Sequence, residues 1–94
     1  MAKIQKTDKS WKLSGDLTVE CAPGLVVESA HLPIQGKLLI DFSSVEHVDT
    51  ATLSLIFEWM REAKKKRCTL KFAHLPENLK SLMALYGVSE LVPH

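Results

Sequence analysis

An aspartate followed by a threonine is the residue pair in this chain best suited to chemistry at a surface. Asp49 and Thr50 follow the apolar run 37–42 after six mostly polar residues and come directly before a long amphipathic segment. The first residues of a helix expose unpaired backbone N–H groups and a partial positive charge. A hydroxyl at that place can contact an incoming carboxylate or carry a phosphate group, which the helix end would stabilise. The pair therefore predicts a contact or modification site at Thr50, although Asp and Thr are also ordinary helix caps.

The segment that must position this pair has the periodicity of an amphipathic helix from Thr50 to about Lys66. Its apolar stripe consists of Leu53, Ile56, Phe57, Met60 and Ala63. Asp49 is a suitable N-cap, and the basic run 64–67 lies at the negative end of the helix dipole. We interpret that basic run mainly as a solvated helix end rather than as a patch for an acidic partner or nucleic acid.

Two large apolar residues, Leu55 and Trp59, lie four positions apart on the flank of the stripe, with Ala51 and Glu58 beyond them. Two interpretations remain open for Leu55 and Trp59. They belong either to the periphery of the core or to an apolar interface that extends from Thr50, because exposed aromatic and aliphatic side chains anchor protein association.

The N-terminal half predicts two strands and a short helix. Apolar and polar residues alternate on both sides of Ser14-Gly15, which predicts a hairpin formed by residues 11–14 and 16–20. Residues 25–32 follow Pro23-Gly24 and predict a short helix that Pro33 ends.

The second half alternates strands with helices. Residues 37–42 form a continuous apolar run, typical of a central strand covered on both faces. Residues 69–73 predict a strand parallel to it, because the intervening helix serves as a crossover. Pro76 begins a last helix, which ends at Gly87, and residues 88–94 predict a short apolar strap. The apolar face of that last helix is predicted to consist of Leu79, Leu82, Met83 and Tyr86.

This order predicts one α/β domain over residues 1–94, with residues 1–8 loosely ordered. The expected fold is a small mixed sheet of about four strands, with an N-terminal hairpin followed by parallel crossovers and with helices packed mainly on one face.

Composition excludes several function classes. The chain has 46% hydrophobic residues and a formal net charge of +1, which gives no general attraction to nucleic acid or to an anionic membrane. No apolar run approaches the ~20 residues of a membrane span, so no direct membrane insertion is expected. Cys21 and Cys68 are too few for a disulfide framework and favour a reduced cytoplasm. The four histidines lack ligand spacing, and no phosphate loop or nucleophile elbow is present, so we expect no metal, no cofactor and no enzymatic activity.

The apolar strand 38–43, the turn 48–53 and the strand and helix that follow resemble the STAS domain, the fold of bacterial anti-sigma-factor antagonists. Within that family the leader 17–23 and the Asp-Thr-Ala turn at Asp49 resemble the small stand-alone STAS proteins of the Mla phospholipid transport system, the MlaB type. The resemblance covers nearly the whole chain. It implies a non-catalytic cytoplasmic subunit that binds the ATPase subunit of an ABC transporter (MlaF-like) and reaches the inner membrane through that complex.

The partner-binding residues that we predict on this basis are Asp49, Thr50, Ala51, Thr52, Leu55 and Trp59. The alternative is an anti-sigma-factor antagonist, because in that branch the hydroxyl residue after the aspartate is phosphorylated by a kinase partner, and Thr50 matches it. Many relatives have Gly two positions after the hydroxyl residue, where this chain has Thr52. A side chain at Thr52 is expected to crowd a partner backbone that approaches the turn closely.

Overall fold

The computed structural model describes residues 2–7 and 9–94. Along that part of the chain the elements are β1 (Lys3–Lys6), β2 (Ser10–Leu17), α1 (Ala22–Ala30), β3 (Lys37–Val48), α2 (Thr50–Lys65), β4 (Thr69–Ala73) and α3 (Glu77–Leu85). The sequence of two strands, helix, strand, helix, strand and helix is the predicted one. None of the helices in these residues is both long and apolar enough to cross a bilayer.

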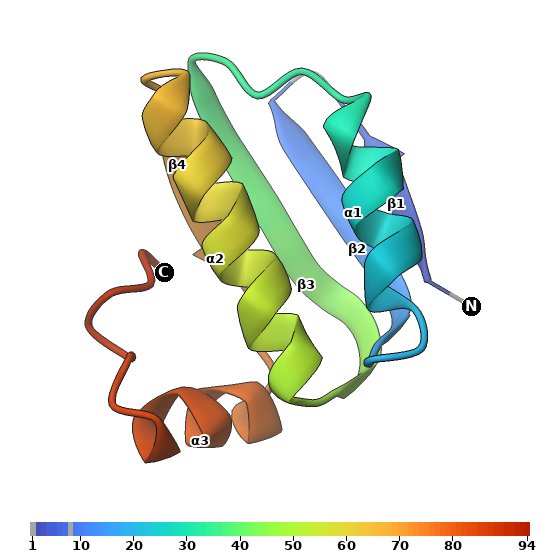
Figure 1. The fold of residues 1–94 in the computed structure, drawn as a ribbon, viewed down its shortest axis with the longest axis vertical. Helices are drawn as coiled ribbons and strands as arrows, with labels where there is room; N and C mark the ends of the chain where they lie inside the picture. Colours follow the sequence, from blue (N-terminus) through green and yellow to red (C-terminus); the bar gives the residue numbers. More distant parts are fainter. Residues whose placement is uncertain (1, 8) are drawn as a thin grey trace.

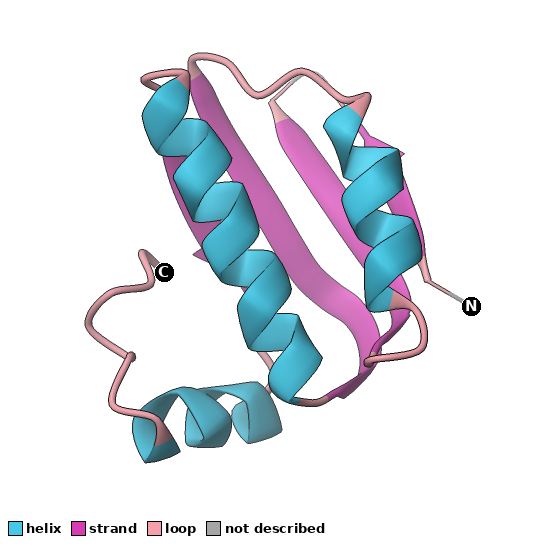
Figure 2. Ribbon diagram, in the orientation of Figure 1, coloured by secondary structure: helices cyan, strands magenta, loops and turns pink. Residues whose placement is uncertain are grey.

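The strands lie in the order β1-β2-β3-β4, so strands that follow one another in the sequence are also neighbours in the sheet. β1 is antiparallel to β2, whereas β2 pairs with β3 and β3 with β4 in parallel. Because parallel neighbours need a crossover, α1 and α2 connect them, and both helices lie over the same face of the sheet (Figures 1 and 2). The predicted mixed sheet with helices mainly on one face is confirmed.

The N-terminal hairpin differs from the predicted one. Ser14 and Gly15 do not form a turn but lie inside β2, where Gly15 has φ +83° and the register with β3 shifts next to it. A glycine with positive φ inside a strand is typical of a bulge. The hairpin is instead formed by β1 and β2, in which residues 3–6 pair with residues 11–14. Met1 and Asp8 belong to the segment predicted to be loose but lie outside the described residues.

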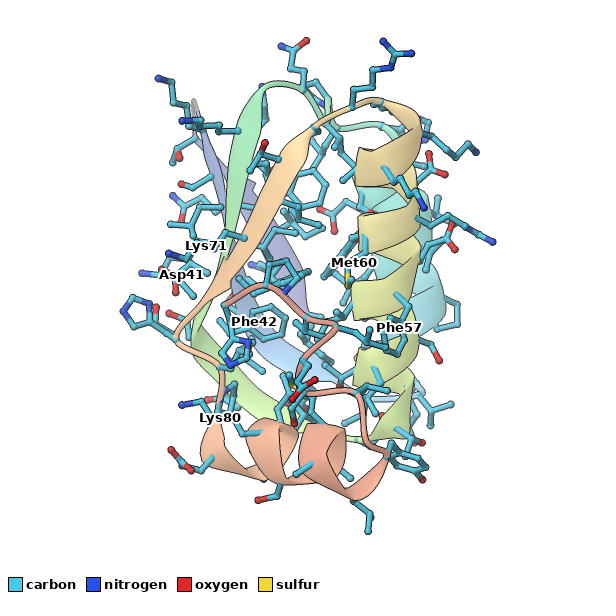
Figure 3. The ribbon with its side chains drawn as sticks, turned by 90° about the vertical axis from the view of Figure 1, so that its left-hand side faces the viewer. Asp41, Phe42, Phe57, Met60, Lys71 and Lys80 are labelled. Atoms are coloured by element: carbon cyan, nitrogen blue, oxygen red, sulfur yellow. The ribbon has the colours of Figure 1, made fainter. Side chains whose placement is uncertain are left out.

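The central strand β3 is longer than predicted and is covered on one face only. Its inward residues Leu38, Ile40 and Phe42 are buried, whereas 37% of Leu39 is exposed on the other face. Figure 3 shows Phe42 between the sheet and the helices, while Asp41 and Lys71 project from the helix-free side. The prediction of burial on both faces is wrong because both crossover helices pack on the same side.

Two aromatic pairs mark the core between the sheet and the helices. Trp11 of β2 meets Trp59 of α2 edge to face, with ring centroids 5.9 Å apart. Phe42 and Phe72 on neighbouring strands form a similar pair at 5.9 Å. Such pairs add to the stabilisation from burial of their apolar area.

The C-terminal segment after α3 returns to the sheet. The N–H of Gly87 bonds to the carbonyl of Ala84 and that of Val88 to the carbonyl of Met83, which is a Schellman motif with Gly87 at φ +67°. Further on, the Phe72 N–H of β4 donates to the Pro93 carbonyl at 2.8 Å. Val92 beside it is buried, so the predicted strap is confirmed.

The predicted apolar face of α3 needs one correction. Leu79 and Met83 of α3 are buried as expected, but Tyr86, which was predicted to share their face, is 57% exposed at the helix end.

Cys21 and Cys68 are both free and half-buried. Burial raises the pKa of the Cys68 thiol, which fits a packed rather than a reactive cysteine.

Candidate functional site

The start of α2 is held by the side chain of Asp49. One carboxylate oxygen accepts a hydrogen bond from the Ala51 N–H at 2.9 Å, as expected for the predicted N-cap. The other oxygen accepts from the Val19 N–H at 3.0 Å, thirty residues earlier. Asp49 therefore joins the tip of α2 to the connection between β2 and α1, and its carboxylate is engaged in structure.

Thr52 completes a capping box from inside the fold. Its hydroxyl accepts from the Asp49 N–H at 3.1 Å and donates to the Leu17 carbonyl at 2.6 Å. The side chain is fully buried. The expectation that Thr52 would crowd an approaching partner is therefore wrong, since the side chain points into the protein and leaves the turn open.

Thr50, the first residue of α2, is exposed. Within the residues that the structure describes, its hydroxyl makes no hydrogen bond to another group. The cap is supplied by Asp49 and Thr52 instead, so Thr50 is not needed for it. A free hydroxyl at the positive end of a 16-residue helix can bind a partner's acceptor or carry a phosphate.

An open groove runs from Thr50 to α3. It has a volume of ≈ 530 Å³ and is lined by Val48, Asp49, Thr50, Asn78, Ser81, Leu82 and Leu85. Leu85 at its outer wall is 76% exposed. Such an exposed leucine beside a mostly apolar groove is a suitable anchor for a protein partner.

A second groove lies on the other side of the helix start, between α1 and α2. Its volume is ≈ 420 Å³ and its lining consists of Val19, Ala22, Pro23, Val26, Ala51, Ser54, Leu55 and Glu58. Val19 is 65% exposed. Thr50 and Ala51 thus lie on a ridge between two apolar grooves, and we call this ridge with its grooves the α2 docking surface.

Three of the predicted partner-binding residues are not available to a partner. Thr52, Leu55 and Trp59 are at most 1% exposed, so the prediction that they present an interface is wrong. Leu55 contributes only to the floor of the groove beside α1. Asp49, Thr50 and Ala51 remain at the surface or half-buried at the helix start.

These three side chains are buried because of the way α2 is rotated about its axis. Trp59 packs toward α1, where its indole N–H donates to the buried Ser29 hydroxyl at 2.9 Å. Phe57 and Met60, predicted as core, are only partly buried on the opposite flank, the flank visible in Figure 3. The alternative of core rather than interface is thus the one that holds for Leu55 and Trp59.

Sequence reasoning missed the outer walls of both grooves. Val19 and Val26 on one side and Leu85 on the other come from segments that were interpreted only as strand or helix. One usable signal was the adjacent pair Val26-Val27, because consecutive helix residues point about 100° apart and two valines in a row extend the apolar face of a short helix toward its surface.

Two carboxylate–histidine pairs lie on the strands or directly after one. Asp16 and His47 are register partners at the end of β2 and β3, with the carboxylate 2.6 Å from the ring Nδ1. The hydrogen bond and the charge of Asp16 raise the pKa of His47. Asp41 accepts from Ser43 N–H and lies 3.0 Å from His74 Nδ1. Partial burial opposes ionisation of Asp41, but these hydrogen bonds prevail and lower its pKa.

Neither pair has a third His, Cys, Asp or Glu ligand beside it in the part of the chain that the structure describes. Within residues 2–7 and 9–94, no group of three or more His, Cys, Asp or Glu side chains could hold a metal ion. The structure thus forms a contact surface at the start of α2. The two carboxylate–histidine pairs belong to the sheet and do not line its grooves.

The family profile described as "Mlab, STAS domain" matches residues 3–93. The chain belongs to the STAS domain family. The profile's description also names the MlaB type that the resemblance indicated. No protein of curated function gives a significant sequence match.

Solved structures show the same fold at low identity. The anti-sigma factor antagonist SpoIIAA in its unphosphorylated form aligns with a TM-score of 0.72 and 10% identity, over 98% of this chain and 85% of that one. A crystal structure of Mglu aligns with a TM-score of 0.60 and 15% identity, over 80% of this chain but only 19% of that one. These likenesses show the STAS fold, and the α2 docking surface is the candidate contact site of this domain.

Proposed function

We propose that this STAS domain is a non-catalytic subunit that binds the cytoplasmic ATPase of a Mla-type phospholipid ABC transporter. The observation that carries the proposal is the exposed Thr50 at the start of α2, between two apolar grooves, in a chain that matches the Mlab profile over residues 3–93. The phospholipid itself would be handled by the membrane-bound and periplasmic partners.

The shape of the surface favours docking over catalysis. Both grooves are open and mostly apolar, and the carboxylate of Asp49 is occupied by two backbone N–H groups. A catalytic base needs a free acceptor aimed at a substrate. A partner, in contrast, needs apolar anchor sites around a polar contact that sets the register, which is what the grooves and Thr50 offer.

The mechanism follows from binding alone. A subunit that contacts one conformation of the ATPase better than another shifts the equilibrium toward the preferred one, and only by the difference in affinity. Because Asp49 and Thr52 fix the helix start to the β2–α1 connection, Thr50 is presented on a rigid support. Little conformational freedom would then be lost on binding.

The test is capture of the ATPase subunit by the full chain. Thr50→Glu places a negative, longer side chain at the centre of the surface and is expected to weaken binding at least about tenfold. Thr69→Glu is the matched control, because Thr69 is also an exposed threonine but begins β4. Absence of capture, or equal capture by both variants and the natural sequence, would contradict the proposal.

A second candidate is an anti-sigma-factor antagonist switched by phosphorylation at Thr50. The unbonded, exposed hydroxyl favours it as well, since a kinase can reach such a group and the helix end would accept the added charge. Incubation with a candidate anti-sigma-factor kinase, followed by mass spectrometry, distinguishes the two functions. A phosphate on Thr50 that abolishes binding to that kinase would favour the antagonist, whereas capture of the ATPase alone would favour the transporter subunit.

A further inference from the structure

Most of the positive charge of this protein lies at the end of the molecule opposite to Thr50. We call it the basic end, and it consists of Lys9, Lys37, Lys64, Lys65, Lys66, Arg67 and Lys71. These are seven of the 12 lysine and arginine residues. Since the whole chain carries +1, the seven cations of the basic end leave −6 for the rest. The net charge of the protein is nearly zero, but its positive and negative charges are therefore strongly separated in space.

The fold brings these residues together from four segments. Parallel strands begin at the same edge of a sheet, so Lys37 at the start of β3 is level with Thr69 at the start of β4. Lys71 of β4 is the register partner of Leu39, whose N–H donates to the Lys9 carbonyl at 2.9 Å. The last turn of α2 and the run that follows it end at the same edge, as Figure 1 shows.

Little on the protein neutralises this charge. All seven side chains are exposed. Lys65 pairs with Glu62 at 3.1 Å, and within the described residues none of the other six takes part in an ion pair. A shallow depression of ≈ 360 Å³ lies among Lys9, Lys37 and Lys71 on the helix-free side, with the half-exposed Leu39 in it.

We propose that the basic end binds the anionic headgroup surface of a phospholipid membrane while the α2 docking surface holds the ATPase. The choice of a membrane as the occupant rests on the proposed function, which brings the chain to a membrane complex. Clustered lysines near an anionic leaflet each add to attraction, and one exposed aliphatic residue among them can reach the interface. The arrangement corresponds to adsorption at the surface, with no insertion of a helix.

The residue types favour a lipid surface over nucleic acid. Six of the seven cations are lysines, which act as point charges, whereas arginine is the residue that reads phosphates and bases in pairs of hydrogen bonds. The exposed apolar residue beside these cations is Leu39, and none of the residues that line the depression among Lys9, Lys37 and Lys71 is an aromatic that could offer a base a stacking platform.

The two surfaces do not compete for space. The basic end lies beyond the C-terminus of α2 and Thr50 lies at its N-terminus, and 16 residues of α-helix span about 24 Å. That separation exceeds the Debye length of about 8 Å at physiological salt, so a charge change at one end leaves the electrostatics of the other largely unchanged. The chain can therefore contact a membrane and a protein at once.

The experiment is vesicle co-sedimentation of the full chain without any partner. One set of vesicles is phosphatidylcholine alone, and the other contains about one third phosphatidylglycerol. Binding is expected only to the anionic set, with loss of binding as salt is raised. The triple variant Lys9→Glu/Lys37→Glu/Lys71→Glu is expected to bind at least about tenfold more weakly than the natural sequence.

The matched control carries the same net charge in another place. Lys3→Glu/Arg61→Glu/Lys80→Glu also reverses three exposed cations, but none of them belongs to the basic end. It is expected to keep at least about half of the vesicle binding if position rather than net charge decides. Thermal unfolding of both variants confirms that each is folded.

Three outcomes would overturn the proposal: no preference for anionic vesicles, equal loss in both triple variants, or binding of double-stranded DNA in preference to vesicles. Capture of the ATPase is measured separately with the Thr50→Glu variant. Since the vesicle assay contains no ATPase, failure of ATPase capture would contradict the proposed function and leave the result on membrane binding intact, and the reverse also holds.

Discussion

The Thr52 hydroxyl donates a 2.6 Å hydrogen bond to the Leu17 carbonyl, which is 35 residues earlier in the chain. The same oxygen accepts from the Asp49 N–H. One buried hydroxyl thus satisfies a carbonyl at the end of β2 and an N–H at the start of α2. Because α2 and the connection that follows β2 both line the groove beside α1, the contact fixes the geometry on which the proposed docking depends.

Replacing Thr52 with Val keeps the shape of the side chain but removes the hydroxyl. The Leu17 carbonyl and the Asp49 N–H would then lose this hydrogen-bond partner, so we expect a loss of about 1–3 kcal/mol in the free energy of unfolding. Thr52→Ser keeps the hydroxyl and loses one buried methyl group, which is expected to cost less, about 1 kcal/mol. Urea denaturation measures both variants. A Val variant as stable as the natural sequence would show that these bonds contribute nothing.

Local patterns were sufficient to predict α2, its aspartate cap, the strand β4 and the parallel pairing. Periodicity and cap preference depend on residues within one or two turns, and a helix between two strands leaves few alternatives for their relative direction. The position of Thr50 at the start of the helix could also be predicted from local sequence, because it follows from the N-cap at Asp49.

Long-range packing explains what the sequence could not show. Two apolar stripes overlap on α2, and the choice between Trp59 and Phe57 as the deeper residue depends on where α1 lies. The Ser14-Gly15 turn signal was overridden because β3 pairs in parallel along the whole of β2. The partner of the Thr52 hydroxyl is a backbone carbonyl far away in sequence, for which no residue type is diagnostic.

The two buried tryptophans provide a matched pair of variants. Trp59 donates its indole N–H to Ser29, whereas Trp11 Nε1 is buried and has no hydrogen-bond partner in the described part of the chain. Both replacements by Phe remove similar ring volume, but only Trp59→Phe breaks a hydrogen bond. We expect Trp59→Phe to destabilise the protein by about 1–2 kcal/mol more than Trp11→Phe, as measured by chemical denaturation. Equal losses would mean that the bond to Ser29 has no net value.

The C-terminal strap is tested by two neighbouring residues. Val92 is 3% exposed and packs against the core, whereas Leu91 is 60% exposed. Val92→Ala removes two buried carbon groups and is expected to lower the free energy of unfolding by about 1.5 kcal/mol. Leu91→Ala is expected to stay within about 0.5 kcal/mol of the natural sequence. A similar effect of both would indicate that the strap does not hold the edge of β4 in solution.

The pair formed by Asp16 and His47 predicts a pH dependence close to the start of α2. Asp16 accepts a hydrogen bond from the protonated ring and its charge favours that form, so the pKa of His47 is raised above its ordinary value of about 6.5. The folded state then holds the proton more tightly than the unfolded state does. The pair stabilises the fold fully below the unfolded pKa, and this contribution disappears as the pH rises through the folded pKa of His47. An NMR titration of the ring measures the shift directly, with Asp16→Asn as the control, in which the pKa of His47 is expected to fall toward its ordinary value. A titration curve that is the same in both proteins would show that the two side chains do not interact in solution.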